Sequence, residues 1–129
     1  MRAGAPMRTT RAFFFLLAVL LVPGCTEKDQ APEGQTIEEF AWAAIDNGAL
    51  LVDVRRPAEF NAGHLPGAIN IDHEEIVARA AELGDKDRVI IVYCRSGRRS
   101  GLAKDRLTKK GFTNVTNAGG LKGMQAARR

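Results

Sequence analysis

Residues 89–101 read VIIVYCRSGRRSG and carry the clearest indication of the fold in this chain. Their first five residues, 89–93, are uncharged and mostly β-branched, a composition typical of a buried strand. Cys94 follows directly, and arginine, serine and glycine then lead into a helical apolar pattern. A strand that passes through a short glycine-containing loop into a helix is typical of a parallel α/β sheet.

Hydrophobic periodicity and turn residues place further elements on both sides of this stretch. A capping box formed by Thr36 and Glu39 begins a helix that ends at Gly48. The segment from Asp72 to Gly84 also has a helical apolar face. The other predicted elements are strands at 50–54, 68–71 and 113–115, and helices at 57–62 and from Leu102 to Gly111. This alternation predicts one α/β domain, residues 36–129, with a mainly parallel central sheet flanked by helices.

Length and charge set limits on the class of protein. The chain has 129 residues, of which 45% are hydrophobic and 26% charged, so it has the size and composition of a single globular domain. The net charge of +4 is unevenly distributed. Residues 25–87 carry 5 basic and 14 acidic side chains, whereas residues 88–129 carry 11 basic and 1 acidic. This asymmetry indicates either an anionic substrate or partner near the C-terminal half, or attraction between the two halves of the fold.

Residues 1–24 predict a lipoprotein-type signal peptide. Three arginines precede an apolar run at 12–22, which is too short to span a bilayer as a helix. Gly24 before Cys25 resembles the bacterial lipoprotein box, in which the signal is cut before the cysteine and the thiol is lipidated. The alternative is ordinary secretory cleavage that leaves Cys25 as a free thiol. Residues 25–35 are then the lipidated cysteine and a flexible, polar tether.

Either way of processing places the protein outside the cytoplasm. The lipoprotein interpretation anchors it through Cys25 on the periplasmic side of a bacterial membrane, which is the outer membrane if the source is Gram-negative. Lipidation of Cys25 would leave Cys94 as the single remaining thiol. A lone thiol in an oxidising compartment is a liability, so its presence favours a chemical role.

Cys94 is the candidate nucleophile because it follows a strand and precedes a helix, where open α/β sheets bind ligands. Backbone N–H groups of such a loop can form an anion-binding nest, which favours the thiolate and lowers its pKa. Three nearby arginines add positive charge. The alternative is a buried structural cysteine beside a solvated turn. We predict Cys94 as the catalytic residue, with substrate bound by Arg95, Ser96, Gly97, Arg98 and Arg99.

Three segments, in this order, resemble signatures of the rhodanese (sulfurtransferase) family. LVDVR at 51–55, with Glu59 and GHLPGAIN at 63–70, resembles its first signature. YCRSGRRS at 93–100 resembles its active-site loop, and the segment at 111–121 resembles its closing segment. Within this family the chain resembles the small secreted single-domain type, of which phage shock protein E is an example.

The resemblance implies a single rhodanese-like domain and a thiosulfate sulfurtransferase. Such an enzyme moves sulfane sulfur from thiosulfate, or a similar small anionic donor, through a Cys94 persulfide to cyanide or a thiol acceptor. A non-catalytic binding module and a dedicated persulfide carrier remain alternatives. Phosphatases related to this fold carry an arginine six residues after the cysteine, where this chain has Ser100, so the tighter loop favours sulfur over phosphate.

Several other residues indicate structural roles. His64 and His73 lie nine positions apart without a cysteine or carboxylate cluster, so we expect no metal, and no cofactor is expected. Asp53 and Arg55 indicate a structural ion pair rather than an acid–base pair. The lysines and arginines near residues 104–110 lack interleaved aromatic residues, so we expect a solvated helix face and no nucleic-acid partner.

Overall fold

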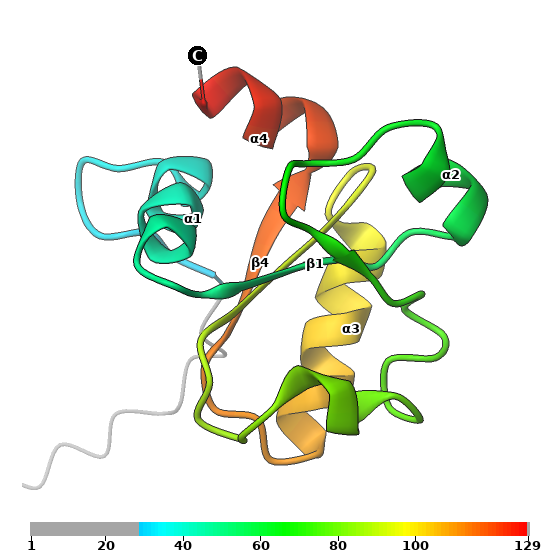
Figure 1. The fold of residues 1–129 in the computed structure, drawn as a ribbon. Helices are drawn as coiled ribbons and strands as arrows, with labels where there is room; N and C mark the ends of the chain where they lie inside the picture. Colours follow the sequence, from blue (N-terminus) through cyan, green and yellow to red (C-terminus); the bar gives the residue numbers. More distant parts are fainter. Residues whose placement is uncertain (1–28, 129) are drawn as a thin grey trace, which may run out of the picture.

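The computed structural model describes residues 29–128 as a three-layer α/β domain (Figure 1). Its elements in chain order are α1 (Ile37–Asp46), β1 (Leu50–Asp53), α2 (Pro57–Asn61), β2 (Ile69–Asn70), the 3₁₀ helix η1 (Ala80–Leu83), β3 (Ile90–Cys94), α3 (Arg98–Lys109), β4 (Val115–Gly120) and α4 (Leu121–Ala127). The four strands form one parallel sheet in the order β2-β1-β3-β4. The predicted α/β domain with a parallel sheet and flanking helices is therefore confirmed.

Strand β3 is buried on both faces, as its continuous apolar composition predicts. Because side chains alternate along a strand, Ile90, Val92 and Cys94 join the core under α3. Ile91 and Tyr93 point the other way, into the core beneath α1 and α4. The Cys94 side chain thus lies on the α3 side of the sheet, at the carboxyl end of the central strand β3.

Local sequence signals account for the first half of the fold. The capping box is present at the start of α1, where the Thr36 N–H donates to Glu39 at 2.9 Å and the Glu39 N–H donates to Thr36 Oγ1 at 3.2 Å. Pro57 occupies the first turn of α2. Its lack of an N–H costs nothing there, because the first N–H groups of a helix have no acceptor within the helix. The predicted and observed bounds of α1, β1, α2, β2 and β3 differ by two residues at most.

The predicted helix from Asp72 to Gly84 is wrong. This segment consists of turns that end in the short 3₁₀ helix η1. Its start is held by long-range contacts, because the His73 N–H donates to Val54 O and the His73 carbonyl accepts from Arg106. The Asp72 carboxylate also accepts from the Glu74 N–H at 3.0 Å, a local turn that competes with helix formation.

The last strand lies later in the chain than predicted, and a helix follows it. Residues 113 and 114 instead contact the turn before β3, since the Thr113 N–H donates to Lys86 O and the Asn114 amide donates to Asp87 O. β4 ends in two glycines, which have low strand propensity. The unpredicted helix α4 packs on α1, and the indole N–H of Trp42 donates to Met124 O at 2.8 Å.

The predicted signal peptide of residues 1–24 and the lipidation site Cys25 lie outside the described residues. Of the predicted tether, residues 29–35 are described. There Asp29 forms an ion pair with Lys104 and accepts from the Asn117 N–H at 3.2 Å. Across residues 29–128, every helix is too short or too polar to cross a bilayer.

The strand order fixes where a ligand can bind. The chain moves outward from β1 to β2 on one side of the sheet and from β3 to β4 on the other. The connections therefore diverge between β1 and β3, the point at which parallel sheets form a crevice beyond their carboxyl ends. Cys94 lies at this point, and in Figure 1 the loop that follows it leads into the N-terminal end of α3.

Candidate active site

The loop after Cys94 wraps its backbone around the thiol. The Gly97 N–H donates to Cys94 Sγ at 3.0 Å. Gly97 has a φ of 94°, in the left-handed region that side chains disfavour, and this conformation turns the chain into α3. One backbone N–H of the predicted cradle therefore contacts the sulfur directly.

Ser100 provides a second contact to the sulfur. This buried residue, in the first turn of α3, places its hydroxyl 3.3 Å from Cys94 Sγ and 2.7 Å from Asn117 Oδ1. A serine hydroxyl has one proton, so it donates to one of these two acceptors at a time. Asn117 also donates to the Gly97 carbonyl at 2.9 Å, which ties the loop to β4.

These contacts determine the pKa of the Cys94 thiol. Burial alone raises this pKa, because it disfavours the charged thiolate. Hydrogen bonds from the Ser100 hydroxyl and from the backbone N–H groups of Ser100, Ser96 and Gly97 act in the opposite direction and outweigh burial. The net result is a pKa below the ordinary value for cysteine, which is the condition for a reactive thiolate.

The end of β4 lies directly against the loop. A Cβ atom added at Gly120 would be only 2.4 Å from the Arg95 carbonyl oxygen. A Cβ added at Gly97 would be 3.2 Å from the Cα of Gly119. Close approach of the two backbones thus requires glycine at positions 97 and 120, whereas Gly119 is favoured by its φ of 84°.

The three predicted arginines have different surroundings. Arg95 and Arg98 are exposed, and among residues 29–128 neither side chain has an ion-pair or hydrogen-bond partner. Arg99 instead donates through both outer nitrogens to Glu59 of α2, at 2.6 and 2.8 Å. The Arg99 guanidinium lowers the pKa of Glu59 to about 2, so this carboxylate is ionised throughout the neutral range.

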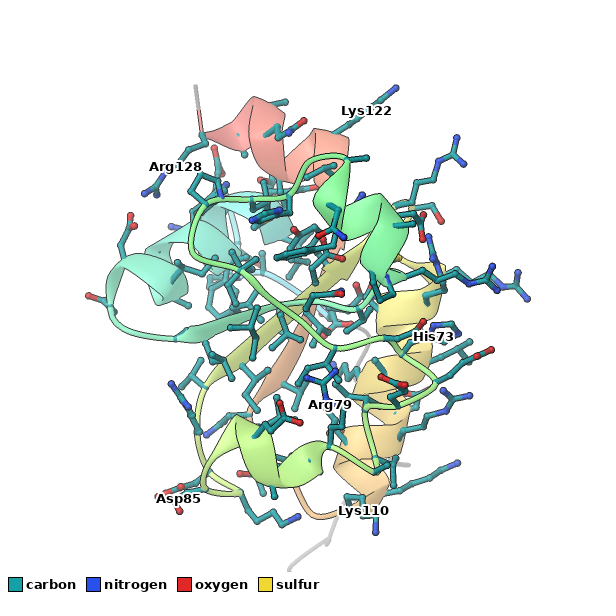
Figure 2. The ribbon with its side chains drawn as sticks, turned by 45° about the vertical axis from the view of Figure 1, so that its right-hand side comes forward. His73, Arg79, Asp85, Lys110, Lys122 and Arg128 are labelled. Atoms are coloured by element: carbon teal, nitrogen blue, oxygen red, sulfur yellow. The ribbon has the colours of Figure 1, made fainter. Side chains whose placement is uncertain are left out.

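A surface pocket opens beside the loop. Its lining includes Arg55, Glu59, Arg95, Ser96 and Lys122. Arg55, Arg95 and Lys122 come from segments that follow the carboxyl ends of β1, β3 and β4. Figure 2 shows Lys122 directed outward at the same end of the molecule as this loop. Of the predicted site residues, the pocket brings together Arg95 and Ser96.

Beneath the site, Asp53 and Arg55 form the structural ion pair that the sequence predicts. Asp53 is fully buried and accepts from Arg55 Nη2 at 2.6 Å and from the Tyr93 hydroxyl at 2.8 Å. Both Asp53 oxygens are used in this network, so it has no free acid–base group to offer. His64 is also structural, since its ring stacks on Phe60 with centroids 3.6 Å apart. Within residues 29–128, no group of histidine, cysteine and carboxylate side chains could hold a metal ion.

The hydrogen bond from Ser100 leads to a prediction on pH dependence. Ser100→Ala removes a donor to the thiolate, so we expect the pKa of Cys94 to rise and its alkylation by iodoacetamide to require a higher pH. Ser96→Ala is the matched control, because Ser96 acts on the sulfur through its backbone N–H. Superimposable alkylation–pH curves for wild type and Ser100→Ala would contradict this assignment.

The Rhodanese-like domain family matches residues 37–127, which include every strand and helix of the domain. The chain belongs to the rhodanese-like domain family. It is 47% identical over 72 residues to thiosulfate sulfurtransferase PspE of Escherichia coli, covering 55% of this chain and 69% of that protein. The resemblance noted from the sequence motifs is thus confirmed.

Two further relatives bear on the function of this rhodanese-like domain. A solved structure described as a rhodanese with anions from E. coli matches with a TM-score of 0.56 and 45% identity, covering 58% of this chain and 89% of that one. A putative sulfur carrier protein of Bacillus subtilis, YrkF, is 39% identical over 72 residues, 56% of this chain and 38% of that protein. These relatives support sulfur transfer in general as the chemistry of the domain.

Sequence reasoning missed four residues that the fold brings to this rhodanese-type site. They are Glu59, Ser100, Asn117 and Lys122. Ser100 could have been found from its spacing, since it lies one helical turn after the loop glycine and faces back to the thiol. Glu59 and Lys122 carry no local signal for this role. Only in the folded chain does Glu59 pair with Arg99, and only there does Lys122 line the same pocket as Arg95.

Proposed function

We propose that this protein is a thiosulfate sulfurtransferase that carries sulfane sulfur as a persulfide on Cys94. The observation that carries the proposal is the contact of the Cys94 sulfur with the Gly97 N–H and the Ser100 hydroxyl, at 3.0 and 3.3 Å. Donors arranged around a sulfur stabilise negative charge there, either on the thiolate or on the outer sulfur of a persulfide. The similarity to PspE supports the same chemistry.

The proposed reaction has two steps. The Cys94 thiolate attacks the outer sulfur of thiosulfate, a sulfur–sulfur bond forms, and the original sulfur–sulfur bond breaks with its electron pair leaving on sulfite. Cyanide, or a small thiolate, then attacks the outer persulfide sulfur, and the Cys94 thiolate is released again. The positive charge of Arg95 and Arg98, which have no ion-pair partner among residues 29–128, would attract the small anionic donor to the loop. Neither step needs a cofactor or a metal.

A second candidate function is persulfide carriage to one dedicated protein acceptor. The similarity to the putative sulfur carrier YrkF favours this alternative. Both functions need the same thiol and loop, so they differ only in the acceptor of the sulfur. An enzyme transfers sulfur to small acceptors such as cyanide, whereas a carrier transfers it only to its protein partner. A non-catalytic binding module is disfavoured, because Cys94 is present with a lowered pKa.

We also propose that the protein works outside the cytoplasm, on the periplasmic side of a bacterial membrane, anchored by a lipid on Cys25. The supporting observations are the apolar run of 12–22 and the position of Cys25 after Gly24. A polar segment from residue 26 onward would separate the anchor from the domain.

Intact-mass measurement tests both proposals. Protein isolated from membranes should lack residues 1–24 and carry lipid on Cys25; the mass of an unmodified chain would exclude the anchor. Thiosulfate should then add one sulfur atom, and cyanide should remove it. In a Cys25→Ser variant Cys94 is the single thiol, so the gain must persist there. Absence of any gain would reject thiosulfate as the donor.

A further inference from the structure

The ion pair between Arg99 and Glu59 changes what Arg99 can do. Its two outer nitrogens both donate to one carboxylate, in the forked geometry that is strongest for this pair. Glu59 also accepts from the Arg56 N–H at 3.1 Å. Both carboxylate oxygens and the guanidinium fork are therefore occupied, and the pair adds no net charge to the wall of the pocket.

The positive charge of the pocket comes from two other residues. Arg95 and Lys122 both line it, both are exposed, and neither has an acidic partner among residues 29–128. They approach from neighbouring strands, since Arg95 directly follows β3 and Lys122 lies in the first turn of α4 after β4. An anion between them would meet two unpaired cations beside the loop that holds Cys94.

We propose that Arg95 and Lys122 bind the anionic end of the sulfur donor, and that Arg99 is a positioning residue that holds and neutralises Glu59 at the wall of this pocket. The proposal rests on the proposed function and refines it. It distinguishes the cations that bind the donor, Arg95 and Lys122, from the cation that neutralises Glu59, which is Arg99. Without Arg99, the Glu59 carboxylate would remain ionised at the pocket wall. It would then attract Arg95 and Lys122 and repel an incoming anion.

A double-variant experiment distinguishes this role from direct binding by Arg99. We expect Arg99→Gln to raise the KM for thiosulfate about tenfold with kcat changed by less than about twofold. In the double variant Arg99→Gln with Glu59→Gln the repelling carboxylate is also gone, so the KM should return to within about twofold of wild type. A double variant as impaired as Arg99→Gln alone would show that Arg99 contacts the donor, and would overturn the proposal.

Lys122 provides a variant that carries little risk of misfolding, because its side chain is exposed. Lys122→Gln should raise the KM for thiosulfate about fivefold to tenfold. Lys110→Gln is the matched control, since Lys110 is an exposed lysine at the opposite end of the molecule (Figure 2). An unchanged KM in Lys122→Gln would remove Lys122 from the donor site.

A second readout does not depend on sulfur transfer. The rate of Cys94 alkylation by anionic iodoacetate, divided by the rate with neutral iodoacetamide, reports attraction of anions to the thiol. Both reagents react with the thiolate, so the thiolate fraction cancels. This ratio should fall in Arg99→Gln and in Lys122→Gln, and should recover in the double variant with Glu59→Gln.

Glu82→Gln is the control for the change of charge at Glu59. Glu82 lies in η1, which precedes the amino end of β3, whereas the site is at the carboxyl end, and it forms an exposed forked pair with Arg79. It should leave the alkylation ratio unchanged. If thiosulfate gives no persulfide but the ratio follows the expected pattern, the anion pocket stands and the proposed donor fails. If turnover is normal but the ratio and KM patterns fail, the assignment of Arg95, Lys122 and Arg99 fails alone.

Discussion

Cys94→Ser is expected to reduce thiosulfate:cyanide turnover to the uncatalysed background, a loss of at least about a thousandfold. A serine hydroxyl stays protonated near neutral pH, and its oxygen cannot carry a persulfide. The N–H of Gly97 and the hydroxyl of Ser100 would remain, yet they would have no sulfur anion to stabilise. The measurement is the steady-state rate of thiocyanate formation with both substrates saturating.

The control for this prediction is Cys25→Ser, which removes the other thiol of the chain and should retain the wild-type rate when assayed in detergent-free solution. Circular dichroism should give the same spectrum for both variants, because the change from sulfur to oxygen at position 94 is small. Substantial turnover by Cys94→Ser would refute a persulfide on this residue. Loss of turnover in Cys25→Ser but not in Cys94→Ser would assign the reactive thiol to Cys25 instead.

Asp53→Ala is expected to lower the free energy of unfolding by about 3–5 kcal/mol, measured by urea denaturation. Asp53 is fully buried and accepts from the Arg55 side chain, the Arg55 N–H and the Tyr93 hydroxyl. Removing the carboxylate leaves the buried Arg55 without its main partner. The Tyr93 hydroxyl loses its acceptor as well, although it still accepts from the Leu65 N–H at 3.0 Å.

A matched variant separates burial from ion pairing in this experiment. Asp46 forms a similar forked pair with Arg128, but both side chains are about half exposed. Asp46→Ala should therefore shift the urea midpoint much less than Asp53→Ala does. If Asp53→Ala proves too unstable to purify, Asp53→Asn keeps the shape and should still lower the urea midpoint. Equal effects at positions 46 and 53 would contradict the role given to burial.

Local patterns were sufficient to predict the parts of this fold that depend on nearest neighbours. The Thr36 capping box, Pro57 in the first turn of α2 and the apolar run of β3 each act within a few residues. The position of Cys94 at a strand end, and hence at the ligand-binding edge of a parallel sheet, follows from the same reasoning. The predicted ion pair of Asp53 and Arg55 is also local, since the two residues are two apart.

Features that depend on distant contacts were not predictable in this way. The turns after Asp72 are held by Val54 and Arg106, which a periodicity pattern does not include. Gly120 lies in a strand because the Arg95 backbone leaves no room for a side chain there. The pairing of Arg99 with Glu59 joins residues forty positions apart, so sequence alone predicted a substrate contact where the structure has an ion pair.

The 2.4 Å distance between a Cβ at Gly120 and the Arg95 carbonyl has a consequence for engineering new specificity. A library that randomises residues 95–99 samples side chains freely, but every functional member inherits the backbone path that Gly120 permits. Widening the loop to admit a larger group than sulfur would therefore require a shift of β4 together with new loop residues. Insertions in the loop combined with changes at 119–120 offer a better search than point substitutions in either segment alone.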